Sequence, residues 1–357
     1  MIRNILFDWS GTLVDDLPAV WSASNHVFER AGVEPMSLER FRDEFELPFE
    51  PFYDRYTPSV PAKQREAWFH GYFPEVLHLI DELPHARRFL ETCRREGLRM
   101  ALFSAIPQEQ YDYLSARNGF GEFFEAVELG VRDKRECIAG LLQRLGMKPE
   151  ETLFVGDMQH DVDAARSGGV YACATLTGYN TLEALRRSDP HLIVEHLGEL
   201  ADILERVRLR RLLRGESEEL QPVATVGGFI LNKAGEALLV KTHKWSGLWG
   251  MPGGKIRFGE SSKAAFAREM LEETGLQVTD IEFVMMQDCV EPPEFYRRAH
   301  FVLSCFAGTC VDELEVRLND EARSFKWVRL QDALGLRLNG PSEKMVRYLL
   351  ESDGSQF

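Results

Sequence analysis

Seven residues at fixed spacings in the second half constrain this chain more than any other feature of its sequence. They are two glycines, an arginine and four glutamates: Gly254, Glu260, Arg268, Glu269, Glu272, Glu273 and Gly275. At about a one in fifteen chance per position, such a set arises by accident on the order of once per 10⁶ chains. An N-cap at Ser261 or Ser262 and a C′ glycine at Gly275 predict one helix across the glutamates.

Three glutamates of this expected helix share one face. Glu269, Glu272 and Glu273 stand at positions i, i+3 and i+4, where like charges repel at a cost of roughly 0.2 to 0.5 kcal/mol per pair. A helix that keeps them together is expected to hold a counter-charge, and Mg²⁺ or Mn²⁺ is the hard cation that carboxylate oxygens prefer. The alternative is a solvated acidic face, which the positions of the glycines and the arginine disfavour.

The seven residues form a complete Nudix box, so the second half of the chain resembles the Nudix hydrolases. The resemblance implies that Arg268 and Glu260 orient the site, with Arg268 also a candidate for binding substrate phosphate. It implies that metal bridges a diphosphate and activates water. The implied metal ligands are the carbonyl of one glycine and three carboxylates that are also the candidate catalytic residues: Gly254, Glu269, Glu272 and Glu273.

Length and charge limit the classes of protein to consider. A chain of 357 residues is too long for one compact core and suits two domains. The net charge of -15 argues against a nucleic-acid backbone as the main partner. A basic stretch at 206–215 is an exception, but its leucines recur at helical spacing, which favours a solvated helix face near a domain junction over a binding patch.

Cysteine usage and hydropathy indicate a cytoplasmic protein. The six cysteines show no CxxC pairing and no ligand spacing, which disfavours structural zinc and disulfides and fits a reducing compartment. No apolar run approaches the length of a membrane span, and the N-terminus is typical of a strand entering a motif rather than of a signal peptide. We therefore expect no membrane partner, and the oligomeric state stays open.

The two halves differ in their periodicity. Up to roughly residue 200, short apolar runs alternate with amphipathic stretches, which predicts a Rossmann-like α/β domain with a parallel sheet. An aromatic and charged stretch after the first strand predicts an inserted helical cap. The later strand-like runs around the glutamate helix predict a mixed αβα sandwich, the Nudix fold. The expected domains are 1–205 with the cap at about 16–84, a helix and linker at 206–221, and 222–357.

Four motifs of the first half stand in order at the carboxyl ends of expected strands, the edge where open α/β sheets bind ligands. They are DWSGT, a serine closing a strand, a lysine in RDKRE, and GDMQHD. Together they resemble the haloacid dehalogenase superfamily of phosphohydrolases. The cap and the run at 156–180 resemble its phosphoglycolate phosphatase branch.

The superfamily resemblance implies a role for each motif residue. Asp8 would attack phosphorus and form an aspartyl phosphate, while Thr12 and Ser104 would hydrogen-bond the phosphoryl oxygens. Lys134 would neutralise charge. The residues implied to hold Mg²⁺ are three carboxylates and one backbone carbonyl: Asp8, Asp157, Asp161 and Ser10. The alternatives are a turn residue for Asp8, a surface charge for Lys134 and a helix N-cap pair for the two later aspartates.

Ser10 departs from the superfamily pattern. Most phosphatases of this superfamily carry a second aspartate there, which is the usual general acid and base and is worth roughly 10² to 10⁴ in rate. The carbonyl of Ser10 can still serve a metal, so the departure puts the efficiency on poor leaving groups in doubt. It also leaves open a lyase that uses a Schiff-base lysine from the cap, for which Lys63 is the candidate.

Several further residues are candidates for substrate contact or catalysis. Trp245 and Trp249 precede the box and either stack on a base or anchor the core. His300 lies on an expected strand, where a packed histidine is favoured over a catalytic one. Possible general bases of the second half are Glu291, Glu294 and Glu321, and candidates for anion recognition in the cap are Arg55, Lys63 and His70.

These expectations combine into a bifunctional phosphohydrolase acting on small phosphorylated metabolites, with Mg²⁺ or Mn²⁺ at both sites. The second half moderately resembles ADP-ribose pyrophosphatases, which favours ADP-ribose or a nucleotide sugar as its substrate. The first half would then remove phosphate from a small monoester, for which the product of the second half is a candidate. The alternatives are a pair of activities on dihydroneopterin triphosphate, or a first half that senses phosphate without turning it over.

Overall fold

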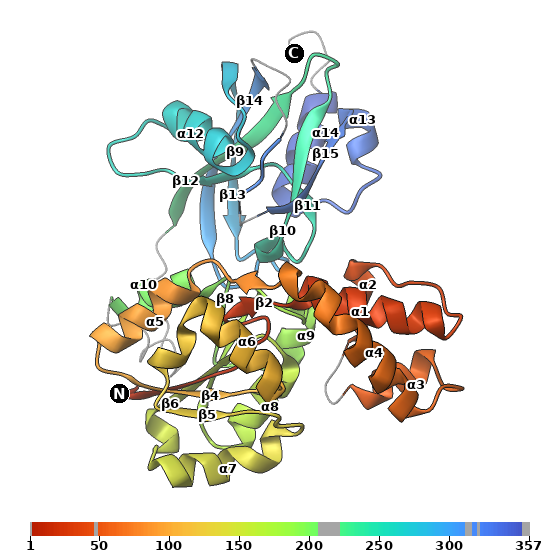
Figure 1. Ribbon diagram of the computed structural model, residues 1–357. Coiled ribbons are helices and arrows are strands. Elements are labelled where there is room, and N and C mark those ends of the chain that lie inside the picture. Colours follow the sequence, from red (N-terminus) through yellow and green to blue (C-terminus); the bar gives the residue numbers. More distant parts are fainter. Residues whose placement is uncertain (1, 46–48, 206–221, 311–315, 320–321, 352–357) are drawn as a thin grey trace. The chain divides into compact units, whose positions relative to one another are not determined.

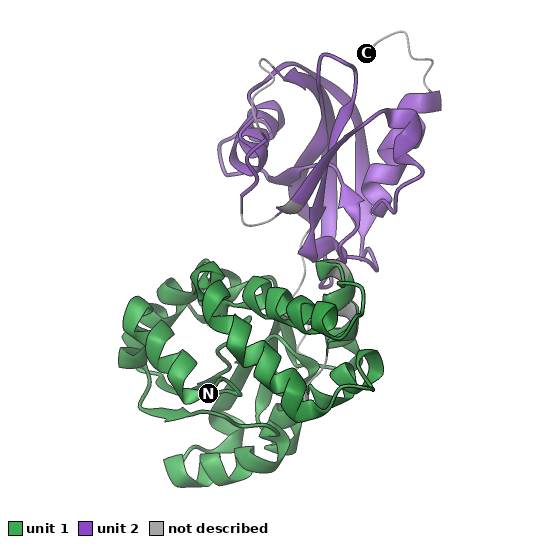
Figure 2. Cartoon of the chain, turned by 45° about the vertical axis from the view of Figure 1, so that its right-hand side comes forward, with its two compact units in different colours: residues 1–218 green, residues 219–357 purple. Residues whose placement is uncertain are grey.

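The computed structural model describes residues 2–45, 49–205, 222–310, 316–319 and 322–351. They form two compact units, Met1–Glu218 and Glu219–Phe357 (Figure 2). The helix and linker expected at 206–221 lie outside the described residues. Within the described part of the chain, no helix is both long enough and apolar enough to cross a membrane.

The first unit is built on a six-stranded parallel sheet in the order β5-β4-β1-β6-β7-β8. Figure 1 labels its strands β4, β5, β6 and β8. Strand β1 lies between β4 and β6, so the order of the strands reverses at β1. The carboxyl ends of these three strands therefore lie side by side at one edge of the sheet. The parallel sheet expected from the sequence is confirmed. The strands are β1 (Asn4–Phe7), β4 (Arg99–Phe103), β5 (Ala126–Glu128), β6 (Thr152–Gly156), β7 (Tyr171–Thr175) and β8 (Leu192–Val194).

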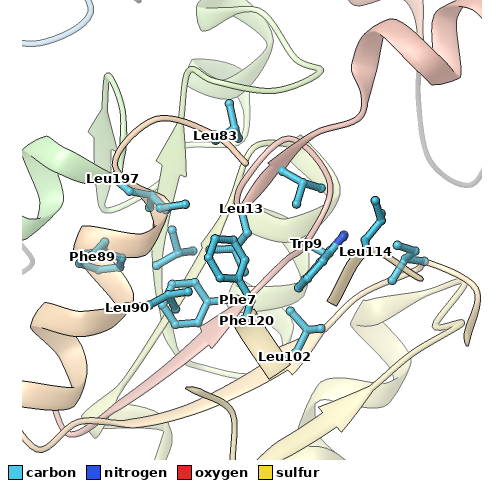
Figure 3. Packing of buried hydrophobic residues seen from close by; sticks show 14 of the residues in the cluster. Phe7, Trp9, Leu13, Leu83, Phe89, Leu90, Leu102, Leu114, Phe120 and Leu197 are labelled. Atoms are coloured by element: carbon cyan, nitrogen blue, oxygen red, sulfur yellow. The ribbon is translucent and has the colours of Figure 1, made fainter. Parts of the chain in front are cut away.

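Helices connect these strands, and a fully buried core anchors β1. Figure 3 shows Phe7 and Trp9 packed among Phe89, Leu90 and Phe120. The ring of Phe7 lies 5.8 Å from that of Phe89, in an edge-to-face arrangement. This packing fixes the end of β1 and the residues that follow it. The helices are α5 (Ala86–Arg95), α6 (Gln108–Asn118), α7 (Lys134–Leu145), α8 (Gln159–Ser167), α9 (Leu182–Arg187) and α10 (Leu197–Glu205), with short 3-10 turns η2 (Phe120–Phe123) and η3 (Pro149–Glu151).

A helical cap is inserted between two short antiparallel strands, β2 (Val14–Asp15) and β3 (Asp81–Glu82). The cap has a core of its own, in which the rings of Phe28, Phe41 and Phe52 are fully buried. Its rigidity therefore does not depend on the parallel sheet alone. The cap helices are α1 (Leu17–Arg30), α2 (Leu38–Glu44), α3 (Glu50–Tyr56) and α4 (Ala62–Val76), followed by the 3-10 turn η1 (Leu77–Leu79).

The second unit is a mixed seven-stranded sheet with helices on both faces, as the sequence predicted (Figure 1). Side chains of β9 alternate between the two faces: Val226 and Ile230 pack with α12, and Phe229 packs with α14. The strands are β9 (Val223–Leu231), β10 (Ala237–Thr242), β11 (Trp249–Gly250), β12 (Gly253–Lys255), β13 (Val278–Val290), β14 (His300–Cys310) and β15 (Ala322–Val328). The helices are η4 (His243–Trp245), α12 (Ser262–Thr274), α13 (Leu330–Ala333) and α14 (Gly340–Glu351).

The glutamate helix α12 begins and ends as its sequence predicts. Ser261 is its N-cap and accepts a hydrogen bond from the backbone N–H of Ala264. Gly275 follows the helix with φ of 72°, a left-handed conformation that favours glycine. Phe266 and Met270 are fully buried on the inner face of α12, and Glu273 near its end is buried as well.

The close approach of β9 to β14 gives a test of the second unit. A methyl group added at Gly228 would overlap the carbonyl oxygen of its pairing partner Phe306 and lie 2.9 Å from Cε2 of Phe266. We expect Gly228→Ala to lower the free energy of unfolding by about 3 kcal/mol or more, because backbone cannot yield as a side chain does. Hydrogen–deuterium exchange of the full chain should show faster exchange in β9 and β14.

Gly227→Ala is the matched control. Its methyl group would meet the carbonyl oxygen of Pro252 at 3.3 Å and Leu303 Cδ1 at 3.4 Å, a milder crowding that small shifts relieve. Equal exchange rates in the two variants would contradict the register of this strand pair.

Candidate active sites

The strand order of the first unit brings its motif residues to one edge of the sheet. Asp8 follows β1, Ser104 follows β4 and Asp157 follows β6, and these three strands are neighbours. Lys134 opens α7, and Asp161 lies in the first turn of α8. Residues more than a hundred positions apart in the chain therefore meet because the carboxyl ends of parallel strands share an edge.

Lys134 is the central cation of this cluster. Its Nζ lies 2.8 Å from Asp8 Oδ1 and 2.6 Å from Asp161 Oδ1, and its side chain is almost completely buried. Burial disfavours the ammonium, but the charges of Asp161 and Asp8 outweigh this effect and raise the pKa of Lys134. The alternative of a solvated surface lysine does not describe this position.

The cluster has the charge and the ligand atoms for a divalent cation. Oxygen atoms of Asp8, Asp157 and Asp161 lie within 4.8 Å of one another, and all three residues are buried. Three carboxylates against the one ammonium of Lys134 leave an excess of two negative charges. Burial, followed by the neighbouring carboxylates, raises the pKa of Asp157. A hard divalent cation that takes oxygen ligands would offset this excess negative charge, so the three carboxylates fit a divalent metal.

The carboxylates are held in place by hydrogen bonds. Asp157 accepts from the backbone N–H of Tyr179 at 2.6 Å and from the hydroxyl of Thr12 at 3.3 Å. Asp161 accepts from the backbone N–H of Met158 at 3.1 Å. The structure thus places the Thr12 hydroxyl on Asp157, whereas the sequence predicted that it contacts phosphoryl oxygens.

A cavity of about 460 Å³ lies over Asp8 within the first unit. Ser10 and Ser104 line it together with Asp8, so the expected nucleophile and the expected phosphate-binding serine face the same space. The other walls come from the cap and from the segments that follow β4, β5, β6 and β7. Their principal aromatic and charged members are Phe45, Phe49, Glu50, Tyr53, Arg65, Glu66, Phe69, His70, Phe73 and Arg132.

Sequence reasoning missed Asp16, which also lines this cavity. Asp16 stands at the N-cap of α1 but makes no capping hydrogen bond. Its carboxylate instead accepts from Tyr179 Oη at 3.0 Å and from the Ser10 hydroxyl. Burial raises the pKa of Asp16 to about 7. An acidic pair before a leucine and a proline is typical of a helix start, so the sequence carried no signal of this role.

The expected anion-binding residues of the cap separate in the structure. His70 lines the cavity, whereas Arg55 and Lys63 are not among its lining residues. Arg55 is exposed and lies 3.7 Å from Glu44. The buried arginine of the cavity is Arg65, which the sequence analysis did not single out.

Arg268 organises the acidic face of α12 in the second unit. Its guanidinium donates to Glu260 at 2.8 and 2.9 Å, to Glu269 at 2.6 Å and to Glu272 at 2.9 Å. It also donates to the carbonyl of Lys255 at 3.0 Å. Hydrogen bonds from Arg268 lower the pKa of Glu260 to about 2. One arginine therefore orients carboxylates from both the helix and the preceding loop.

Glycine at position 254 lets strand β12 lie against this face. A Cβ at Gly254 would come within 2.5 Å of the Glu269 carboxyl carbon. The backbone N–H of Gly253 donates to Glu273 Oε2 at 3.0 Å. These contacts put the Gly254 backbone beside Glu269 and Glu273, which is consistent with the expectation that all three bind one metal ion.

Arg257 is a further partner of this face that sequence reasoning missed. Its guanidinium lies 3.1 and 3.0 Å from the two carboxylate oxygens of Glu272. Among the described residues, the group of three acidic side chains with converging ligand atoms is the one around Asp8, and the α12 glutamates are not gathered in that way. The four glutamates of the box still exceed Arg257 and Arg268 by two charges. Their oxygen donors fit a hard cation, provided that Arg257 releases Glu272.

Those remaining candidates of the second unit that the structure describes lie close to other side chains or to backbone groups. The ring of Trp245 packs 4.8 Å from Phe295, and Trp249 packs against the core beneath α14. For both tryptophans, this packing favours a role in anchoring the core over stacking on a base. The possible bases are placed as follows: Glu291 pairs with Arg298, Glu294 accepts from the backbone N–H of Gly340, His300 lies 3.8 Å from Asp288, and Glu321 falls outside the described residues.

Comparison with known proteins assigns both halves. The family described as haloacid dehalogenase-like hydrolase matches residues 5–175, and the NUDIX domain family matches residues 221–349. The chain joins a haloacid dehalogenase-like hydrolase to a NUDIX domain. Both resemblances expected from the sequence are confirmed. The two domains make the chain a hydrolase of phosphate esters and pyrophosphates.

Relatives of the haloacid dehalogenase-like half include phosphoglycolate phosphatases. The enzyme of Pseudomonas putida is 28% identical over 245 residues, which is 64% of this chain and 90% of the relative. That of Synechococcus elongatus is 26% identical over 198 residues, covering 54% and 93%. A predicted phosphatase from Clostridium acetobutylicum has a solved structure with a TM-score of 0.52 at 16% identity, covering 58% of this chain and 100% of that one. At that identity the structural likeness shows the fold.

Removing the buried ammonium tests the charge balance around Asp8. Lys134→Met leaves three buried carboxylates without their cation, so we expect the free energy of unfolding in metal-free buffer to fall by roughly 3 to 5 kcal/mol. Urea unfolding with a chelator present measures this change. The matched control is Arg135→Met, because Arg135 is exposed and pairs with Asp133 at the surface. A Lys134→Met protein as stable as this control would contradict the proposed balance.

Proposed function

We propose that the chain is a bifunctional, metal-dependent phosphohydrolase. The haloacid dehalogenase-like half would hydrolyse a small phosphomonoester through Asp8, and the NUDIX half would cleave a nucleoside diphosphate linked to a second group. The observation that carries the proposal for the first half is the convergence of Asp8, Lys134, Asp157 and Asp161 beside a cavity. For the NUDIX half it is the Arg268-centred face of α12 against Gly254.

The chemistry of the first half follows from the positions of its side chains. A carboxylate oxygen of Asp8 attacks phosphorus, the bond to the ester oxygen breaks, and an aspartyl phosphate forms. The ester oxygen leaves with a proton, and water then cleaves the acyl phosphate to regenerate Asp8. Lys134 would balance charge on Asp8, and Ser104, which lines the same cavity, would bind a phosphoryl oxygen. A divalent cation held by Asp157, Asp161, Asp8 and the Ser10 carbonyl would supply electrostatic stabilisation of the transferring group.

Asp16 and Ser10 together offer the proton that the ester oxygen needs. Ser10 stands where the superfamily usually has its acid, and its hydroxyl is hydrogen-bonded to the Asp16 carboxyl in the same cavity. This arrangement favours a first half that hydrolyses phosphomonoesters over one that only binds phosphate. The cap lysine of the lyase alternative, Lys63, is absent from the cavity lining.

In the NUDIX half, Glu269, Glu272, Glu273 and the Gly254 carbonyl would hold a divalent cation, Mg²⁺ or Mn²⁺, which would supply Lewis-acid activation of the attacking water and charge neutralisation for the diphosphate. Arg268 holds Glu269 and Glu272 in position for this. ADP-ribose or a nucleotide sugar remains the favoured substrate, on sequence resemblance. Cleavage of either yields monophosphates that the first half would accept. Dihydroneopterin triphosphate is the alternative with the same order of steps.

Asp16→Asn tests the proposed proton path. The amide keeps the shape of the side chain but carries no transferable proton, so turnover of alkyl phosphates should fall by about 10²-fold or more. Turnover of aryl phosphates with acidic leaving groups should change far less, because those groups leave without a proton. Steady-state kinetics on a leaving-group series measures the contrast. An equal loss across the series would mean that Asp16 supports the site without donating.

Crossed variants test the independence of the two sites. Asp8→Asn should lower phosphomonoester hydrolysis by more than about 10³-fold, because the amide is no nucleophile, and should spare diphosphate cleavage. Glu273→Gln should do the converse, with a loss of about 10²-fold. Phosphorus NMR of a substrate panel with each variant follows both products. Loss of both activities in either variant would contradict two separate sites.

A further inference from the structure

The cavity over Asp8 is large for a short-chain phosphate ester. Its volume of about 460 Å³ equals the space of about fifteen water molecules in the liquid. Cavities of about 300 to 1,000 Å³ are typical of sites that enclose drug-sized ligands. A phosphoryl group with a two-carbon acid would leave most of this space to water, so its size favours a larger leaving group.

Aromatic rings from the cap form much of the wall. Phe45, Tyr53, Phe69 and Phe73 line the cavity, and all but Phe69 are at most 8% exposed. Phe69 and Phe73 stack on one another with ring centroids 5.3 Å apart. The hydroxyl of Tyr53 is engaged by Ser24 at 2.9 Å, so Tyr53 adds aromatic rather than hydrogen-bonding surface. Such a wall gains most from burying a ring or another flat apolar group.

The charges of the wall do not suit a carboxylate leaving group. Arg65 is buried, but Asp54 neutralises it at 2.5 Å, and it also donates to Thr57 at 3.4 Å. Glu50 and Glu66 line the cavity as well and would repel an anion. The other cationic groups, Arg132 and His70, are exposed. A neutral leaving group should therefore bind against this wall more favourably than a leaving group that carries a carboxylate.

We infer that the haloacid dehalogenase-like half acts on phosphomonoesters whose leaving group is a neutral, ring-bearing moiety of about nucleoside size. A two-carbon acid is the wrong substrate for this cavity. The inference rests on the proposed phosphatase function of Asp8 and specifies the class of ester that Asp8 attacks. It also makes a nucleoside monophosphate, one product of cleaving a nucleoside diphosphate derivative, a chemically suitable substrate.

A matched pair of esters isolates the contribution of the ring. Ethyl phosphate and 2-phenylethyl phosphate both release a primary alcohol, so their chemical steps are alike and they differ in the ring alone. We expect kcat/KM to be about 10- to 100-fold higher for the phenylethyl ester. Phosphoglycolate should be no better than ethyl phosphate, and a nucleoside 5′-monophosphate should match or exceed the phenylethyl ester.

Variants connect the preference to the cavity. Phe69→Ala should abolish most of the phenylethyl preference, and Phe69→Leu should keep part of it with the apolar volume. Tyr113→Ala is the control, because Tyr113 is an exposed aromatic residue of α6 outside the cavity lining. It should leave the preference unchanged.

The outcomes separate this inference from the proposed function. Equal kcat/KM for the two alkyl esters, or a preference for phosphoglycolate, would overturn the inference while leaving an Asp8-dependent phosphatase in place. Retention of the phenylethyl preference in Phe69→Ala would also overturn it, because the ring would then bind elsewhere. Failure to hydrolyse any ester, and acetyl phosphate as well, would overturn the proposed function and the inference together.

Discussion

The ion pairs of Lys134 with Asp8 and Asp161 are the constraint on which the first unit depends. A buried carboxylate is costly, and three of them at one sheet edge are tolerable only with compensating charge. The backbone must also come close: a Cβ at Gly156 would overlap Asp161, and one at Gly178 would overlap Asp157. Strand order, glycine placement and the buried ammonium together keep three buried carboxylates close to one another at a cavity.

The second unit handles concentrated negative charge differently. Arg268 binds several of its glutamates at once, and Arg257 binds Glu272 from the loop. Glu272 is partly exposed, whereas Glu273 is buried and accepts a hydrogen bond from the backbone N–H of Gly253. Arginines from a loop and a helix therefore balance the charge of these glutamates, in place of one buried ammonium. In the first unit, by contrast, the acidic side chains are already gathered within ligand distance.

The sequence predicted those features that follow from local rules or from repeated topology. The bounds of α12 follow from Ser261 and Gly275, and the meeting of Asp8 with Asp157 follows from the shared edge of parallel strands. The role of Asp16 could not be predicted, because its partner Tyr179 lies 163 positions away and burial sets the state of its carboxyl. The same holds for Arg65, whose charge is neutralised by Asp54 through packing within the cap.

Covalent capture of phosphate at residue 8 tests the central claim most directly. Wild-type protein mixed with a phosphomonoester is quenched in acid within the first turnover, and peptides are examined by mass spectrometry. The account predicts one phosphoryl group on the peptide that contains Asp8, absent after Asp8→Asn and discharged when the reaction proceeds to completion. Steady hydrolysis with no phosphorylated peptide in the first turnover, or with the phosphoryl group on another residue, would contradict it.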